Sequence, residues 1–327
     1  MKLPVEEIRE LVERACRAHG AADREARLFA DVLIEAELRG RPTHGLNRLE
    51  GILGMLRSRR PAEPRIVTER GPLVVVDRNG QSGYLVGAFV ADAAVRVAVR
   101  EGHALVGARN TLHCGMLGYY VAAAARRGVI ALLFADCSPL VAPWGGADSV
   151  LGTNPIAAAF PHQPYPILID MGTSATTYGA LDLARRRGEP AARDAALDAQ
   201  GRVTEDPAAV HTVLPLAGHK GYALGLLVQL LSGVVVGAAA VPADHRDYGL
   251  LMLALRTDLF APADQYEQGV ADLVSRIKSV RLRPGFAEIL IPGERAWRER
   301  EQRLQEGIEM SEALWRTLKD HQPEDST

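Results

Sequence analysis

The chain has 327 residues, of which 47% are hydrophobic and 24% charged, so it is long enough for about two domains with a substantial core. Its 38 Lys and Arg and 40 Asp and Glu give a formal net charge of −2, which provides no electrostatic footprint for nucleic acid or an anionic membrane. The three cysteines form no CxxC pair, which argues against a disulfide framework and a structural zinc site. The charged N-terminus has no apolar signal segment, so a reducing cytoplasm is the simplest interpretation.

Helices are predicted at both ends of the sequence. Apolar residues recur at helical spacing from Val5 to Ala15, and a second helix is expected to begin at Asp23, a plausible N-cap, and to end at Gly40. Residues 295–321 are strongly charged and also carry a helical apolar pattern.

The stretch GRPTHGLNR, residues 40–48, separates the second helix from a third. Pro42 disfavours helical geometry in the residue before it, and Thr43 is expected to cap the third helix. His44 and Arg48 therefore lie at a helix–turn–helix corner, one at the turn and the other one helical turn later. An isolated His/Arg pair of this kind can also belong to a solvated surface loop.

The middle of the chain has α/β composition. Residues 58–72 are polar and rich in proline, which indicates a crossing between domains. Short aliphatic runs, PLVVVD, HALVGAR, VIALLFAD and PILIDM, then alternate with helices predicted over 86–101 and 115–127. A further strand is expected in LLMLALRTDLF, after residue 249.

Residues 222–241, YALGLLVQLLSGVVVGAAAV, carry no charge and are long enough for a transmembrane helix. However, Gln229 and Ser232 interrupt the run, glycines recur at close-packing spacing, and no aromatic belt accompanies it. We therefore expect a buried helix in the centre of a large core, apolar on all sides, and no membrane span.

Polar loops interrupt the apolar elements at NTLHCG (110–115), APWGGADSVLGTNP (142–155), DMGTS (170–174), PLAGHKGY (215–222) and IPGER (291–295). Loops at strand ends and helix starts present backbone N–H groups that suit phosphate or carboxylate. His113 and Asp170 could instead be simple caps, and Lys220 a solvated lysine. No GxGxxG, P-loop, HExxH or GxSxG pattern is present, so the motifs alone predict an α/β enzyme with an anion site.

Taken in order, eight stretches resemble the type-2 malate/L-lactate dehydrogenase family: LRGRPTHGLNRL, ARNTLHCGMLGYY, VAPWGG, LGTNPIA, PILIDMGTS, VTEDP, PLAGHKGYALGL and IPGE. These are NAD(P)-dependent oxidoreductases whose members also act on ureidoglycolate, sulfolactate, diketogulonate and cyclic ketimines such as piperideine-2-carboxylate. The resemblance implies an α/β (α+β), non-Rossmann fold with a largely antiparallel or mixed sheet flanked by helices. It further implies a homodimer, a cofactor-binding domain at 71–285, and a helical substrate and dimerisation domain from 1–70 and 286–327.

The resemblance also implies the roles of individual residues. His44 matches the proton donor to the substrate, Arg48 the residue that holds the substrate carboxylate, and His113 a second histidine that orients the substrate. A histidine with a pKa of about 6.5 can supply a proton near neutral pH, and the planar arginine suits a carboxylate. NADH or NADPH would be the cofactor, with no metal. Substrate contacts fall on Thr43, Thr153 and Asn154, and cofactor contacts on Ile169, Asp170, Met171, Gly172, Thr173, Ser174, His219, Lys220, Gly293 and Glu294.

The chain departs from the family pattern beside both histidines. The family usually has Asp-Ser where this chain has Pro42 and Thr43, and an Asn and an aromatic residue where it has Leu112 and Cys114. These changes make the expected pocket more apolar, so we predict reduction of a 2-oxo acid or cyclic 2-ketimine carboxylate less polar than malate.

Two other hypotheses are kept. The altered loops are compatible with a catalytically altered family member that acts as a dimeric cofactor-binding or partner protein. A metal-dependent hydrolase or lyase would use His44, His113 and Asp170. For the reductase, the expected small-molecule partner is a carboxylate substrate.

Overall fold

The structure, a computed structural model, describes residues 2–58, 62–243 and 247–322. Its centre is a seven-stranded mixed sheet in the order β2-β3-β4-β10-β5-β6-β7. Within this sheet β3 and β4 are parallel, and every other neighbouring pair is antiparallel. The strands are β2 (Arg65–Arg70), β3 (Leu73–Asp77), β4 (His103–Thr111), β5 (Val129–Ala135), β6 (Ile156–Phe160), β7 (Ile167–Met171) and β10 (Tyr248–Arg256).

Helices cover both faces of this sheet. The apolar residues of α4 (Gly83–Glu101) and α5 (Leu117–Ala125) pack on one face, where they share a core with Val106 and Leu133. A Cβ added at Gly107 would instead lie 2.9 Å from Val236, just after η3 (Gln229–Val235). Because neighbouring strand residues point to opposite faces, α4 and η3 flank β4 from opposite sides.

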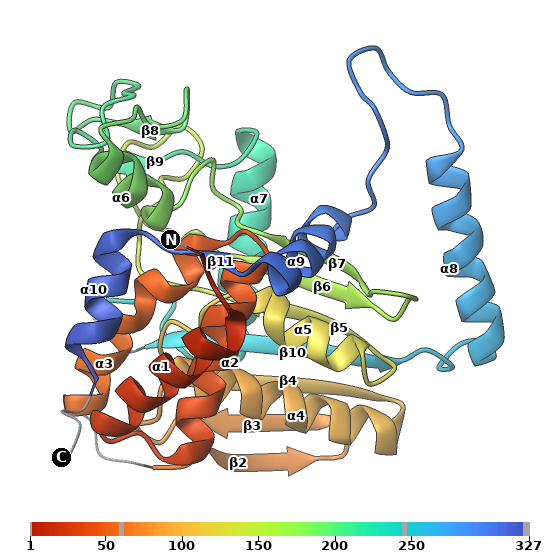
Figure 1. Cartoon of the computed structure of the whole chain (residues 1–327). Coiled ribbons are helices and arrows are strands. Elements are labelled where there is room, and N and C mark those ends of the chain that lie inside the picture. Colours follow the sequence, from red (N-terminus) through yellow and green to blue (C-terminus); the bar gives the residue numbers. More distant parts are fainter. Residues whose placement is uncertain (1, 59–61, 244–246, 323–327) are drawn as a thin grey trace.

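The two ends of the chain form a second core beside the sheet. In Figure 1 the helices α1 (Val5–Ala18), α2 (Asp23–Leu38) and α3 (Leu49–Ser58) lie beside α10 (Glu312–Asp320). Phe29, Leu33 and Leu53 are fully buried there together with Leu318. The short strands β1 (Lys2–Leu3) and β11 (Ile308–Glu309) pair antiparallel and join both ends.

The strands predicted in the middle of the chain are confirmed, three boundaries are corrected, and one segment contains a strand that was not predicted. The N-cap of α2 is Ala22 and not Asp23; its N–H donates to the Glu25 carboxylate at 3.0 Å. The third helix does not begin at Thr43: two 3-10 turns, η1 (Pro42–His44) and η2 (Leu46–Arg48), precede α3. The charged tail is α9 (Glu294–Glu306), β11 and α10, because Gly307 turns the chain at φ +87° against Leu3. Residues 58–72, expected as a crossing, contain the edge strand β2.

The apolar segment 222–241 is not the buried core helix that we expected. It consists of α7 (His219–Val228) and the π-helical turn η3, and its buried face carries Gly225, Gln229, Ser232 and Gly233. Buried polar groups are found where hydrogen-bond partners exist, and Gln229 finds them in Asp136 and Asn154. The large apolar side chains Leu226, Leu227, Leu230, Val234 and Val235 point outward and are exposed. In the described ranges, no helix has the length and apolar character to cross a membrane.

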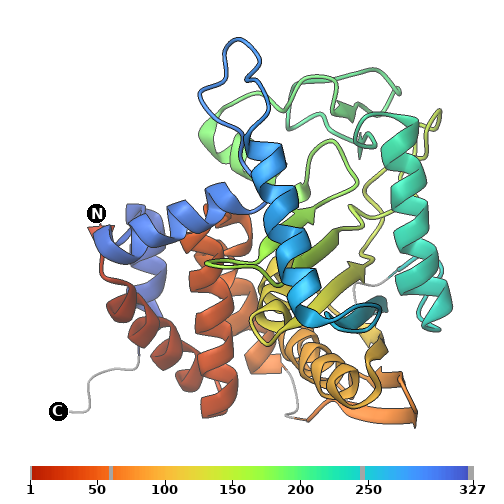
Figure 2. The same cartoon turned by 90° about the vertical axis from the view of Figure 1, so that its right-hand side faces the viewer.

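The remaining elements lie at the periphery. The small unit formed by α6 (Tyr178–Arg187), β8 (Ala196–Leu197) and β9 (Thr212–Val213) has its own cluster around Val141 and Leu181. Helix α8 (Ala263–Lys278) has no buried residue. It stands apart from the body in Figure 1 and crosses in front of the sheet in Figure 2.

Gly249 of β10 provides a test of the packing against η3. A Cβ at Gly249 would lie 1.5 Å from the Ser232 carbonyl oxygen, a backbone atom that cannot rotate away. We expect Gly249→Ala to lower the free energy of unfolding by at least the ~1–3 kcal/mol typical of overpacking, measured by thermal or urea denaturation. Gly269→Ala, on the exposed α8 with nothing within 4 Å of the new Cβ, should be neutral or stabilising. Wild-type stability of Gly249→Ala would contradict this packing.

Candidate active site

Two histidines from separate parts of the chain line one cavity. His44 lies in η1, and His113 lies in the loop between β4 and α5; their ring centroids are 5.9 Å apart and their planes are inclined by 16°. The cavity has a volume of about 70 Å³, and Thr153, predicted as a substrate contact, lines it as well. Its other lining residues are mainly apolar or weakly polar: Thr111, Leu112, Cys114, Gly115, Leu117, Ala135, Asp136, Cys137, Pro155, Tyr248, Gly249 and Leu250.

The tautomer of His113 follows from its backbone contact. Its Nδ1 accepts the Gly115 N–H at 3.3 Å, so the neutral ring carries its proton on Nε2. His113 is solvent-exposed as a residue, but its ring is packed on two sides, by the edge of Tyr84 and by the His44 ring, each with centroids 5.9 Å away. Burial, then the neighbouring His44 and Arg48, lower the pKa of His113 to about 3. At neutral pH it is a hydrogen-bond donor and not an acid.

His44 is neutral in the free protein for a similar reason. Burial, together with the positive charges of Arg48 and Arg41, lowers its pKa to about 4. Its Nδ1 lies 3.2 Å from the Thr43 hydroxyl, which can donate to the neutral ring or accept from the protonated one. The protonation of His44 is therefore sensitive to any anion that binds beside Arg48.

Arg48 is oriented by the same corner. Its Nε donates to the Thr43 carbonyl oxygen at 2.7 Å, which fixes the plane of the guanidinium. Thr43 and Arg48 border a cavity of about 200 Å³ together with Tyr178 and Gly179 of α6. A Cβ on Gly179 would lie 2.9 Å from the Thr43 Cβ and 3.4 Å from Arg48 Nη2, so the glycine keeps this approach open.

Asn154, the third predicted substrate residue, lies beneath the cavity wall. It is fully buried with φ +36°, and its Nδ2 donates to the Gly225 carbonyl at 2.9 Å and to Gln229 Oε1 at 3.0 Å. The Thr153 carbonyl accepts the N–H and the hydroxyl of Thr173 at 2.9 and 3.2 Å. The 153–154 backbone is thus held between α7 and the loop after β7.

Asp136 is a buried group at this site that sequence reasoning missed. Its Oδ1 accepts the Gly249 N–H at 2.5 Å and its Oδ2 accepts Gln229 Nε2 at 2.9 Å. Burial raises the pKa of Asp136 to about 7, against the opposing effect of these two hydrogen bonds. The available signal was an acid placed directly after the apolar run VIALLFA.

The predicted cofactor loop follows β7 as expected from its sequence. Ile169, Asp170 and Met171 end the strand, and Gly172, Thr173 and Ser174 follow. Asp170 accepts the Gly118 N–H near the start of α5 at 2.9 Å, and burial raises its pKa. It therefore acts as a cap for α5.

Within the described part of the chain, no group of three His, Cys, Asp or Glu is arranged to hold a metal ion.

The same loop leads to the start of α7. The Leu216 N–H donates to the Thr173 carbonyl at 2.9 Å, and His219 and Lys220 form the exposed first turn. Gly218, at φ +67°, caps α7 without a side-chain hydrogen bond, so the first N–H groups of the helix have no capping side chain. Trp144, which we did not predict, is 59% exposed, and its indole packs over Gly218 and beside His219. The signal for it was the exposed aromatic in VAPWGG.

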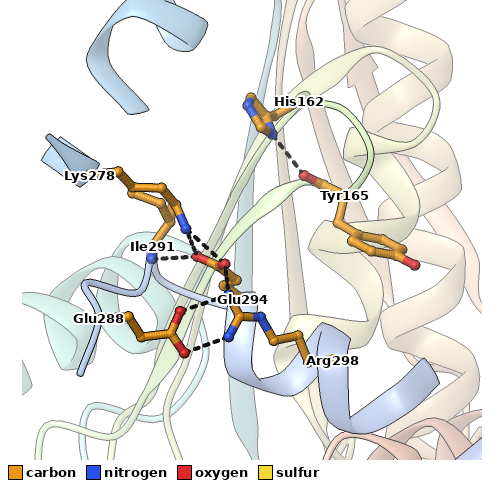
Figure 3. Close-up of polar contacts among 7 residues, drawn as sticks. All are labelled: His162, Tyr165, Lys278, Glu288, Ile291, Glu294 and Arg298. Carbon is orange, nitrogen blue, oxygen red and sulfur yellow. Dashed lines mark hydrogen bonds and ion pairs between the residues drawn. The ribbon is translucent and has the colours of Figure 1, made fainter. Parts of the chain in front are cut away.

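Gly293 and Glu294 lie apart from the two histidines. Gly293, at φ +91°, packs against Leu168 of β7. The Glu294 carboxylate accepts Lys278 Nζ at 2.7 and 2.8 Å, the Ile291 N–H at 3.0 Å and the Arg298 guanidinium (Figure 3). It borders a separate cavity of about 380 Å³. This ion-pair cluster ties the end of α8 to α9.

Comparison with known proteins gives a consistent result. The family model described as malate/L-lactate dehydrogenase matches residues 3–319. A malate dehydrogenase from Pyrococcus abyssi is 33% identical over 94% of this chain and 90% of its own length. An L-sulfolactate dehydrogenase from Methanothermobacter thermautotrophicus is 32% identical over 96% and 94%. The crystal structure of malate dehydrogenase from Entamoeba histolytica superimposes with a TM-score of 0.92, at 25% identity over 98% of this chain and 97% of that one.

The electrostatic coupling between Arg48 and His44 can be measured directly. Because the Arg48 charge lowers the pKa of His44, Arg48→Met should raise it from about 4 toward the ordinary ~6.5. The rise should be partial, since burial is the larger cause. Histidine ring NMR as a function of pH measures it, with the exposed Arg57→Met of α3 as the control. An unchanged or lower His44 pKa in Arg48→Met would show that the two groups are not coupled.

Proposed function

Because the chain belongs to the malate/L-lactate dehydrogenase family of NAD-dependent oxidoreductases, we propose that it transfers hydride to a 2-oxo acid or a cyclic 2-ketimine carboxylate, and reversibly oxidises the 2-hydroxy acid. The observation that carries this proposal is the pairing of His44 and His113 in one cavity, with Arg48 bordering the next. Such a reduction needs a proton at the oxygen or nitrogen and a partner for the carboxylate. A histidine, His44, can supply the proton, and an arginine, Arg48, can pair with the carboxylate.

The order of events follows from the charges. The substrate carboxylate binds the Arg48 guanidinium, for which a planar bidentate partner is best suited. Its negative charge offsets the positive charges that lower the pKa of His44, which raises that pKa and favours the protonated ring in the complex. His44 then donates this proton to the carbonyl oxygen or imine nitrogen as the adjacent carbon is reduced. His113 donates a hydrogen bond through Nε2 and orients the same atom.

The dinucleotide supplies the hydride when it is bound. The residues that would hold it are the loop of residues 169–174 and the start of α7 at His219 and Lys220. Uncapped N–H groups and a lysine at the start of α7 suit the pyrophosphate of the dinucleotide. The exposed indole of Trp144 offers an aromatic face on which a ring of the dinucleotide could stack. Gly293 and Glu294 belong to the proposed cofactor site as well: Gly293 packs against Leu168 of β7, while the Glu294 carboxylate is paired with Lys278. The proposed cofactor is NADH or NADPH.

The chain is proposed to form two domains. We assign residues 71–285 to cofactor binding and residues 1–70 with 286–327 to substrate binding and dimerisation. A largely antiparallel sheet with one parallel pair, together with the absence of a GxGxxG motif in the sequence, supports a dinucleotide site that is not of the Rossmann type. The site would then lie where loops from β4, β5 and β7 meet η1.

The walls of the cavity favour a less polar substrate than malate. Leu112, Cys114, Pro155 and Leu250 line it, and burial raises the pKa of the Cys114 thiol to about 12. These groups offer packing and no cation for a second carboxylate. A 2-oxo acid or ketimine with an apolar side chain fits them best.

Turnover provides the direct test. Oxidation of NADH and NADPH, followed by absorbance, should occur with a member of a panel of 2-oxo acids and cyclic ketimine carboxylates. His44→Ala should lower kcat/KM by ~10²–10⁴-fold, because it removes a general acid. The exposed His103→Ala should be silent. Full turnover in His44→Ala would remove the proton-donor assignment, and cofactor binding without turnover on any substrate would favour the catalytically altered alternative.

We further propose that the protein is a homodimer whose interface extends beyond the helical domain to α8 of the cofactor-binding domain and the segment after it. This arm has no buried residue in α8, yet it exposes Leu273, Ile277, Val280 and Phe286, which are 37–58% accessible. Exposed apolar residues that lie together mark interaction surfaces. A second copy of the chain would cover them.

The mass in solution tests this interface. Light scattering after gel filtration should give twice the 35.3 kDa chain mass. Leu273→Asp with Phe286→Asp should give the single-chain mass, because two buried carboxylates would oppose association. Val99→Asp, at an exposed apolar position of α4, should leave the dimer intact. A wild-type mass of one chain would contradict the proposal.

A further inference from the structure

We propose that Glu37 is a positioning residue for the catalytic corner, which we define as residues 40–48. Its buried carboxylate holds the turn between His44 and Arg48 and so sets the position of the proton donor relative to the carboxylate-binding arginine. This inference rests on the proposed function, because it assumes those roles for His44 and Arg48.

The first evidence is the hydrogen bond that begins η2. Glu37, in the last turn of α2, is 6% exposed, and its Oε1 accepts the Leu46 N–H at 2.8 Å in the protein interior. Leu46 itself is 1% exposed. A buried backbone N–H needs a partner, and here a side chain from the preceding helix provides it. The bond is made between His44 and Arg48 in the sequence, so it fixes the chain between the two functional groups.

The second evidence is steric. A Cβ on Gly45 would lie 2.2 Å from Glu37 Oε1 and 2.6 Å from its carboxyl carbon. Gly45 has φ −91° and ψ −144°, and the Glu37 carboxylate occupies the space that a side chain would take there. Glu37 and Gly45 therefore form a matched pair in which the absent side chain of one makes room for the other.

Three backbone hydrogen bonds lie within the corner: His44 N–H donates to the Arg41 carbonyl, Gly45 N–H to that of Pro42 and Arg48 N–H to that of Gly45. None of them uses the Leu46 N–H, whose acceptor is the Glu37 carboxylate. η1 and η2 are single 3-10 turns of three residues each, joined at Gly45. Asn47 Nδ2 donates to the Pro42 carbonyl at 3.1 Å, and Arg48 Nε to that of Thr43. Loss of the Glu37 acceptor would leave the Leu46 N–H buried and unpaired, and the turn would move to solvate it.

Helix α9 closes the corner from the other side. A Cβ on Gly40, at φ +67°, would lie 2.4 Å from Glu299 Oε2. Arg303 donates both to the Glu299 carboxylate and to the Glu37 carbonyl oxygen. The two glutamates thus occupy the space beside the two glycines of the corner, and the arginine joins them.

The test compares variants at both members of the pair in the full-length protein. Glu37→Ala should lower kcat/KM on the order of 10²-fold, with kcat reduced and KM raised, because displacement by about 1 Å has this effect in active sites. Glu37→Gln retains an acceptor oxygen and should remain within about three-fold of wild type. Gly45→Ala should be as impaired as Glu37→Ala, and in the Glu37→Ala background it should add little, since the carboxylate that it would strike is absent. The dinucleotide affinity, measured by Trp fluorescence, should be unchanged throughout.

A readout independent of turnover separates this inference from the proposed function. The His44 ring NMR signals and their pKa should change in Glu37→Ala and stay unchanged in Glu37→Gln. Should Glu37→Ala not fold, Glu37→Asp serves instead, because it keeps the charge and withdraws the oxygen by one methylene. If wild type reduces no substrate but the His44 signals respond as stated, the proposed function fails and the positioning inference stands. Unchanged kinetics and unchanged His44 signals in a folded Glu37→Ala or Glu37→Asp, or additive losses in the double variant, would overturn it.

Discussion

One wall of the cavity lined by His44 and His113 depends on a buried chain of hydrogen bonds. Asn154 donates to Gln229, Gln229 donates to Asp136, and Asp136 accepts the Gly249 N–H. These four residues belong to the loop before β6, to η3, to the end of β5 and to β10. A buried polar network is stabilising only when its members are satisfied together, so the network requires all four elements in one arrangement. That arrangement places Thr153 and Asp136 opposite the histidines.

The surroundings of both histidines lower their pKa values. Burial and the charges of Arg48 and Arg41 make His44 a poor base in the free protein, and His113 is neutral beside it. In the proposed mechanism, a substrate carboxylate at Arg48 offsets this charge and raises the pKa of His44. Substrate binding and acid catalysis would then be coupled through a single guanidinium. A neutral analogue of the substrate lacks the charge that prepares the acid.

The sequence predicted local features well, and it failed where long-range partners decide. The strands and helices with strong apolar patterns were found, and the corner at His44 and Arg48 was placed by proline and glycine signals. Its two 3-10 turns were not predicted; the N–H of Leu46, which opens the second turn, bonds to the Glu37 side chain, a partner that local propensity does not reveal. The segment 222–241 was interpreted as buried on all sides, since hydropathy does not show that Gln229 has a buried carboxylate as its partner. Asp136 was overlooked because an acid at a strand end is ordinarily solvated. The convergence of His113 on His44 was implied by family resemblance, and no spacing in the sequence could have predicted it.

The pairing of the corner with α9 has a consequence for the order in which the protein is made. Residues 40–48 are synthesised about 250 residues before Glu299 and Arg303, which close the corner. Helices α1–α3 can collapse around Phe29 and Leu33 before then, yet the strand β1 has no partner until β11 appears. His44 and Arg48 can therefore reach their final geometry only after α9 has been translated. Until then, the nascent chain contains both residues but lacks the contacts that align them.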